Sequence, residues 1–120
     1  MILHITTSKE WADALKKGEY KATSLETDGF IHCSTLRQTL DTANVFFKGQ
    51  KNLVLLCIDV ERLDAEIKYE EPAGGKEHDP ALGNLFPHVY GPINLLAVIK
   101  VLDFPPKDDG YFELPMELSV

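Results

Sequence analysis

Apolar and polar residues alternate at the start of the chain, and this pattern predicts a half-buried strand over residues 2–6. Thr7 and Glu10 then form a capping-box pattern, which predicts a helix that begins after Thr7 and ends at Gly18. A short extended segment is expected over residues 20–25. The chain is therefore expected to open as a strand, a helix and a second extended segment.

A strand that runs into a helix is predicted next. Residues 29–33 form an apolar run that opens at Gly29, and Thr35 with Gln38 repeats the capping-box pattern. Apolar residues at helical spacing continue this helix to Gly49. Such a junction gathers free backbone N–H groups at one point, which suits an anionic ligand.

The remainder of the chain is predicted to be mostly strands. Residues 53–58 are continuously apolar, as in a central strand covered on both faces, and residues 59–63 suit a short helical turn. Further strands are expected over residues 67–70, 86–90 and 95–102. Proline and glycine mark residues 71–84 as a long loop of the kind that often covers a binding site. This order predicts a single α+β domain over residues 1–120, with two main helices and a mixed, mostly antiparallel sheet.

Composition and charge narrow the functional classes. The 120 residues are 44% hydrophobic and 26% charged, which is typical of a globular protein with its own core. The net charge is −7 and the lysines and arginines are scattered, so a broad nucleic-acid surface is not expected. No stretch approaches the roughly 20 apolar residues of a membrane span, and no signal peptide is visible. Cys33 and Cys57 lie in apolar runs, which predicts reduced core thiols in a cytoplasmic protein of undetermined oligomeric state.

The histidines are the main candidates for chemistry. His4, His32 and His88 lie in predicted strands, whereas His78 lies in the polar loop. Histidine serves as an acid or base near neutral pH, as a metal ligand or as a hydrogen-bonding residue. We expect the three strand histidines to line one pocket, with His32 and His88 as the candidate catalytic acid and base. The other candidate ligand-binding residues are Thr6, Ser34, Thr35 and Tyr90.

Metal and nucleophile chemistry are less well supported. His4, His32, Cys33 and His88 could form a metal site, but Cys33 follows His32 in an extended run and should point to the opposite face. We therefore expect no metal. Ser34 or Thr35 could act as a nucleophile. However, there is no GxSxG motif, and a helix cap explains a hydroxyl at this position more simply.

Acidic residues near the loop are assigned no catalytic role. Glu70, Glu71 and Asp79 are interpreted as a solvated strand end and loop face rather than as a catalytic pair.

Two segments resemble a known family. The sequence LHI at residues 3–5, GFIHCS at residues 29–34 and FPHVYGP at residues 86–92 resemble the mostly bacterial family known as domain of unknown function 952. The resemblance covers residues 2–114, and the family has no established activity.

A more distant resemblance is to the ADP-ribosyltransferase-like folds. Residues 4–6 look like their first motif, residues 30–47 like their strand–helix element, and residues 90–101 like their late strand. The resemblance implies a split antiparallel sheet around a cleft for NAD.

The same resemblance implies roles for particular residues. His4 and Thr6 would contact a ribose or its phosphate, and His32 and Ser34 would flank the nicotinamide. The late strand has no glutamate where these enzymes carry their catalytic one, and His88 and Tyr90 occupy that neighbourhood.

The leading hypothesis is a histidine-lined cleft for a nucleotide or NAD-like ligand, in which the helix start at Ser34 and Thr35 steadies phosphate. Whether it catalyses a reaction is left open, no cofactor is assigned, and NAD is the candidate ligand. One alternative is a non-catalytic module that holds a small metabolite or docks a protein partner at Phe86 and Tyr90. Another is that the histidines are structural and clamp strand ends through backbone hydrogen bonds.

Overall fold

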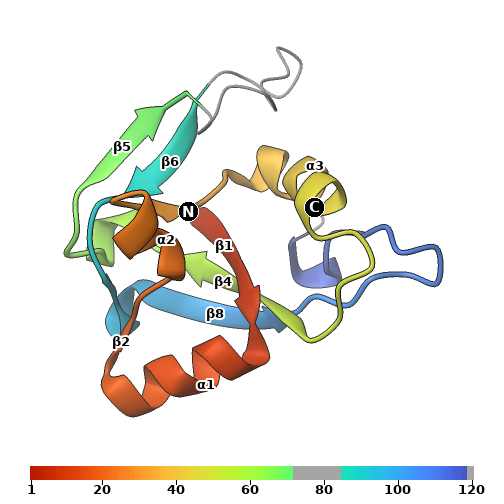
Figure 1. The fold of residues 1–120 in the computed structure, drawn as a ribbon, viewed down its shortest axis with the longest axis horizontal. Helices are drawn as coiled ribbons and strands as arrows, with labels where there is room; N and C mark the ends of the chain where they lie inside the picture. The colour runs from red at the N-terminus through yellow and green to blue at the C-terminus, as the bar shows by residue number, and fades with distance from the viewer. Residues whose placement is uncertain (72–84, 119–120) are drawn as a thin grey trace.

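Antiparallel strands form the framework of the protein. The structure is a computed structural model that describes residues 1–71 and 85–118. Its helices and strands are β1 (Ile2–Thr7), α1 (Ser8–Lys17), β2 (Glu19–Tyr20), α2 (Thr23–Thr27), β3 (Ile31–His32), α3 (Leu36–Phe46), β4 (Leu53–Ile58), β5 (Ile67–Glu70), β6 (Phe86–Val89), β7 (Ile93–Asn94) and β8 (Val98–Asp103). Within the described ranges the strands form three sheets, of order β1-β4-β8, β3-β6-β5 and β2-β7 (Figure 1). Every strand pair in these sheets is antiparallel, where a mixed, mostly antiparallel sheet was predicted.

β4 is the central strand of the first sheet, and all six of its residues are buried. Alternate side chains of β4 belong to two different cores, with Val54, Leu56 and Ile58 in the first and Leu53, Leu55 and Cys57 in the second. This confirms the predicted central strand that is covered on both faces, because neighbouring side chains of a strand point to opposite sides.

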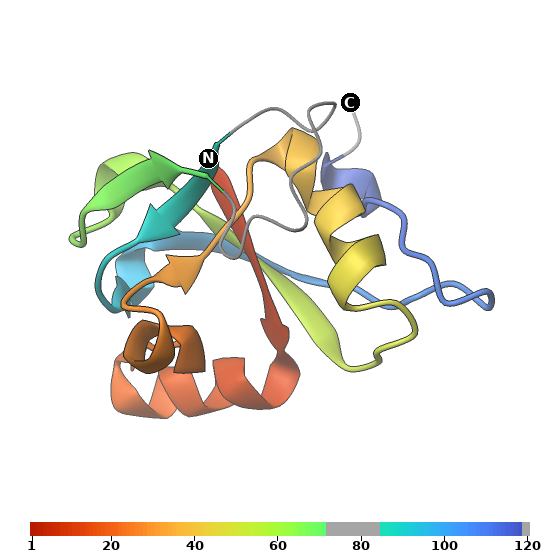
Figure 2. The same ribbon diagram turned by 45° about the horizontal axis from the view of Figure 1, so that its top comes forward.

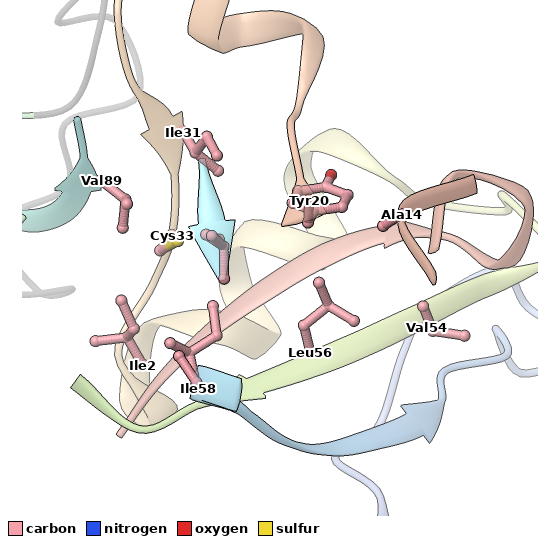
Figure 3. Packing of buried hydrophobic residues seen from close by; sticks show 11 residues of the cluster. Ile2, Ala14, Tyr20, Ile31, Cys33, Val54, Leu56, Ile58 and Val89 are labelled. Atoms are coloured by element: carbon pink, nitrogen blue, oxygen red, sulfur yellow. The ribbon is translucent and has the colours of Figure 1, made fainter. Parts of the chain in front are cut away.

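The two cores lie on opposite faces of the first sheet. In the first core, Leu56 and Val54 face Tyr20 and Ala14 (Figure 3). The second core packs α3 and the C-terminal segment against the other face, through residues that include Ala43, Phe104 and Phe112. Cys33 lies in the first core and Cys57 in the second, and both are free thiols, as predicted for reduced core cysteines.

The segment that follows β3 connects the two larger sheets. Leu3 and Ser34 form an isolated antiparallel bridge, in which each backbone N–H donates to the carbonyl of the other residue over 2.8 Å. In the part of the chain that the structure describes, no second backbone pair joins β1 to β3. The sheets therefore diverge from this bridge (Figure 2).

The predicted helix signals are found in both main helices. The Thr7 side chain accepts a hydrogen bond of 3.0 Å from the Glu10 backbone N–H, and α1 ends at Gly18 in the left-handed region, at φ 87°. At the start of α3, the Gln38 side chain accepts a hydrogen bond of 2.9 Å from the Thr35 backbone N–H. Both N-terminal caps are therefore confirmed.

Two expected elements differ from the structure. Residues 20–25 were predicted to be extended. Instead, β2 ends at Tyr20 and α2 begins at Thr23. A helix of five residues is too short to show a repeating apolar face. Residues 95–97, predicted as strand, form a 3-10 turn, and β8 begins at Val98.

The predicted helical turn after β4 is confirmed at residues 60–62. Positions 72–84 of the predicted loop, which include His78 and Asp79, lie outside the described residues. No helix among the described residues has both the length and the apolar content to cross a bilayer.

Candidate functional site

A cleft of about 550 Å³ lies beside β1, where β1 and β3 diverge. Its volume falls in the range of sites for small organic molecules. The lining residues come from β1, α1, β2, the start of α2, the end of β3, α3, β4 and β6. They include five predicted site residues: His4, Thr6, His32, Ser34 and His88. Two other predicted site residues, Thr35 and Tyr90, are not among the lining residues.

His4 is fixed at the inner side of this cleft. Its Nδ1 lies 2.6 Å from the carbonyl oxygen of His32, and its Nε2 lies 2.7 Å from the hydroxyl of Tyr20. Since a carbonyl only accepts, Nδ1 carries a hydrogen. Burial lowers the pKa of His4 to about 4. The ring is therefore neutral near neutral pH, and Nε2 acts as an acceptor.

Tyr20 and Thr6 extend this hydrogen-bonded chain. Because Nε2 of His4 is an acceptor, the Tyr20 hydroxyl donates its single hydrogen to it. The hydroxyl oxygens of Tyr20 and Thr6 lie 3.0 Å apart, so Thr6 is the donor to Tyr20 when His4 is neutral. Burial also raises the pKa of Tyr20, which keeps its hydroxyl protonated. His4 thus has both ring nitrogens engaged within the protein.

Tyr20 was not among the predicted site residues. β2 is only two residues long and gives no pattern of its own. The available signal was indirect. His4 and Thr6 are two residues apart and lie on the same face of a buried strand, and buried polar groups require a hydrogen-bond partner.

His32 and His88 are opposite each other on β3 and β6. The Cys33 N–H donates to the Pro87 carbonyl over 3.0 Å, which places the two histidines at a non-hydrogen-bonded position of the ladder. The carbonyl of His32 therefore points away from β6 and reaches His4. The side chains of such a pair are close, and these two ring centroids lie 5.6 Å apart, at an interplanar angle of 66°.

Each of these two histidines is paired with a carboxylate. Asp28 Oδ2 lies 2.8 Å from His32 Nε2, and Glu70 Oε1 lies 2.9 Å from His88 Nδ1. Glu70 Oε1 also accepts a hydrogen bond of 2.5 Å from the Tyr90 hydroxyl. This bond and the one to His88 lower the pKa of Glu70, and the same contact raises the pKa of Tyr90.

Glu70 is the last residue of β5 and its side chain is 38% exposed, as expected for a solvated strand end, but it also contacts His88 and Tyr90. β5 and β6 pair so that Lys68 is opposite His88, and Glu70, two residues further along β5, lies on the same face as Lys68. The carboxylate is thus within reach of His88 and Tyr90. Tyr90 belongs to the surroundings of the cleft through Glu70 rather than to its lining.

Phe30 holds the two rings in place. Its ring stacks on that of His88 at a centroid distance of 4.0 Å and lies 4.7 Å from that of His32. Only 3% of the His88 residue is exposed, whereas 43% of the His32 side chain is. One histidine is therefore embedded and the other is open to solvent.

The start of α3 is occupied by its own side chains. Ser34 Oγ lies 2.9 Å from the hydroxyl of Thr39, which donates to the Thr35 carbonyl over 2.8 Å, so Ser34 donates to Thr39. The Gln38 amide also donates to the Leu85 carbonyl over 2.7 Å. The cap interpretation of Thr35 is confirmed, and the hydroxyl of Ser34 is engaged within the protein.

The expected orientation of Cys33 is confirmed. It lies in the first core, away from the face that carries His32, and burial raises the pKa of its thiol. In the part of the chain that the structure covers, no three His, Cys, Asp or Glu side chains are grouped so that they could hold a metal ion.

The charged lining residues are acidic, and α3 carries one of them, Asp41, together with apolar residues. Among the described lining residues, Glu10 and Asp41 carry carboxylates and none is a lysine or arginine. α3 contributes Val45 and Phe46, which are both more than half exposed. The cleft thus has an apolar wall on α3, with acidic groups as its formal charges.

Comparison with known proteins places the chain in a family. Residues 5–101 match the family described as "Protein of unknown function (DUF952)", which is most of the chain. The chain belongs to the DUF952 family. No curated protein matches it.

Solved structures support this family assignment. The DUF952 chain is similar to the protein CC0527 from Caulobacter crescentus, with 33% identity to its crystal structure and a TM-score of 0.83. That match covers 99% of this chain and 98% of the other. The solution NMR structure of CC0527 matches with 34% identity and a TM-score of 0.75, over 92% of this chain and 89% of the other.

Proposed function

We propose that the cleft of this DUF952 protein binds a nucleoside-type small molecule, such as the nicotinamide riboside part of NAD. The observation that carries the proposal is the convergence of His4, His32 and His88, from three strands distant in sequence, on one cleft of about 550 Å³. A few directional polar groups combined with an apolar wall are typical of small-molecule sites.

The charges of the cleft favour the nucleoside over its phosphates. Glu10 and Asp41 would repel a phosphate group, and no lysine or arginine lies among the described lining residues to attract one. A riboside has a neutral sugar, and a nicotinamide ring joined to ribose is positively charged. Such a flat ring suits the apolar wall formed by Val45 and Phe46.

An ADP-ribosyltransferase-like architecture is part of this proposal. Its support is the divergence of β1 and β3 beside the cleft. A second support is Glu70, because β5 brings a carboxylate to His88 and Tyr90 even though the strand that bears His88 carries none.

Titration of isotope-labelled protein tests the binding. We expect nicotinamide riboside and NAD to shift backbone amide signals of residues 4–6, 32–34 and 41–47. The absence of shifts from both compounds at millimolar concentration would contradict the proposal.

A matched pair of variants locates the site. Phe46→Ala should weaken binding, because Phe46 belongs to the apolar wall of the cleft. Leu96→Ala should leave binding unchanged, since Leu96 is 80% exposed and does not line the cleft.

Acid–base catalysis on the bound ligand is a second candidate function. The observation that favours it is that His32 and His88 each hold a carboxylate on one ring nitrogen, an arrangement that orients an imidazole for proton transfer. His32→Ala and His88→Ala should abolish release of nicotinamide from NAD. Saturable binding without any release in the parent protein would instead indicate a non-catalytic binding module.

A further inference from the structure

The protonation pattern of His32 and His88 defines what kind of ligand group they accept. Asp28 and Glu70 are carboxylates, and an ionised carboxylate only accepts hydrogen bonds. The nitrogens that face them, Nε2 of His32 and Nδ1 of His88, therefore carry hydrogens. In the neutral rings the other nitrogens, Nδ1 of His32 and Nε2 of His88, are bare acceptors.

Both bare nitrogens belong to residues that line the cleft. Among the described residues neither has a hydrogen-bond partner, in contrast to the two nitrogens of His4. No buried side-chain nitrogen or oxygen in the described part of the chain lacks a partner. His88 is 3% exposed, and the cleft is the open space that it lines.

The two rings that carry these acceptors are neighbours. His32 and His88 are directly opposite on neighbouring strands, with ring centroids 5.6 Å apart, and Phe30 contacts both rings. A ligand group that satisfies two adjacent acceptors must present two adjacent donors. Two hydroxyls on neighbouring carbon atoms do this. A phosphate or carboxylate does not, because its oxygens are acceptors and cannot hydrogen-bond to the acceptor nitrogens of the rings.

We propose that His32 and His88 bind the vicinal diol of a ribose, with the 2′-hydroxyl and the 3′-hydroxyl each donating to one bare imidazole nitrogen. This inference rests on the proposed nucleoside-binding function and names the part of the ligand that these two residues recognise. Asp28 and Glu70 are positioning residues, because each fixes which nitrogen of its histidine carries the hydrogen.

Deoxy ligands test the diol contact directly. The probes are nicotinamide riboside and adenosine, the two nucleosides of NAD, each with its 2′-deoxy and 3′-deoxy form. Loss of either hydroxyl should weaken binding to the parent protein roughly tenfold, the change expected for one net hydrogen bond. Equal binding of the ribose and deoxy forms overturns the diol contact but leaves nucleoside binding intact. No binding of any form overturns both proposals.

A second measurement needs no ligand. Imidazole ¹⁵N NMR of the parent protein should show hydrogens on Nε2 of His32 and on Nδ1 of His88. The reverse pattern in either ring overturns the proposal even if nucleosides bind.

Matched variants complete the test. An amide can donate to the facing ring nitrogen, so Asp28→Asn and Glu70→Gln should reduce the preference for ribose over the deoxy forms. Asp13→Asn and Glu66→Gln serve as controls, because these carboxylates face Lys9 and Lys68 rather than a histidine. A ribose preference that survives both Asp28→Asn and Glu70→Gln contradicts the positioning role.

Discussion

A hydrogen bond from the imidazole of His4 replaces the backbone pairing that β1 would otherwise make with His32. The Leu3–Ser34 bridge sets a register in which Ile5 would pair with His32, yet no such pair forms among the described residues. Instead Nδ1 of His4 donates to the His32 carbonyl over 2.6 Å. A side chain thus satisfies the backbone of β3 at the point where the two strands diverge, and the cleft lies beside that point.

The stability of the protein should fall between pH 6.5 and about pH 4 because of His4. In the unfolded chain His4 takes up a proton near its ordinary pKa of 6.5, whereas burial lowers the folded pKa to about 4. The unfolded state therefore binds more protons in this interval, and the unfolding free energy decreases as the pH falls. The contribution, about 3 kcal/mol, is fully present above pH 6.5 and absent below the folded pKa.

Chemical denaturation at several pH values measures this slope. His4→Gln should be less stable at neutral pH and should show a flatter dependence across the same interval. Glu70 has a lowered pKa, so its contribution has the same sign but is lost only below its ordinary value of 4.5. An unchanged slope in His4→Gln would show that His4 is not the group responsible.

Tyr20→Phe should destabilise the protein although it leaves the packing of the core nearly unchanged. The substitution removes the hydroxyl that satisfies His4 Nε2 and contacts Thr6, and it leaves a buried acceptor without a partner. We expect a loss of about 1–3 kcal/mol in unfolding free energy, measured by denaturant titration. Tyr69→Phe is the matched control, because Tyr69 is 51% exposed and should change stability little. Equal stability of the two variants would contradict the hydrogen-bonded chain.

The cysteines should be unreactive in the folded protein. Cys33 and Cys57 are buried, and burial raises the pKa of both thiols, so little thiolate forms near neutral pH. A thiol-specific reagent should label them only as fast as the protein unfolds, and added denaturant should accelerate labelling in parallel with unfolding. Rapid labelling of either thiol under native conditions would argue against its placement in a core.

Local patterns in the sequence predicted most of the framework. The helix caps at Thr7 and Thr35 and the central strand at residues 53–58 depend on short-range chemistry and on continuous burial, which the sequence displays directly. α2 was missed because Ala22 gives no side-chain cap and five residues show no periodicity.

The site was predicted only in part for a different reason. The histidines stand out by residue type, but Tyr20 and Glu70 gain their roles from strands that meet only in the folded protein. Glu70 is indistinguishable in sequence from any carboxylate at a strand end until the β5–β6 register brings it to His88. Pairings between strands distant in sequence are not encoded in any local pattern.

The Leu3–Ser34 bridge has a consequence for how sequences of this family can vary. The bridge consists of two main-chain hydrogen bonds, which every amino acid except proline can make in both directions. The side chains that line the opening beside it can therefore be exchanged during evolution without loss of the junction. Relatives with this strand arrangement can keep the same opening while its walls become specialised for different molecules.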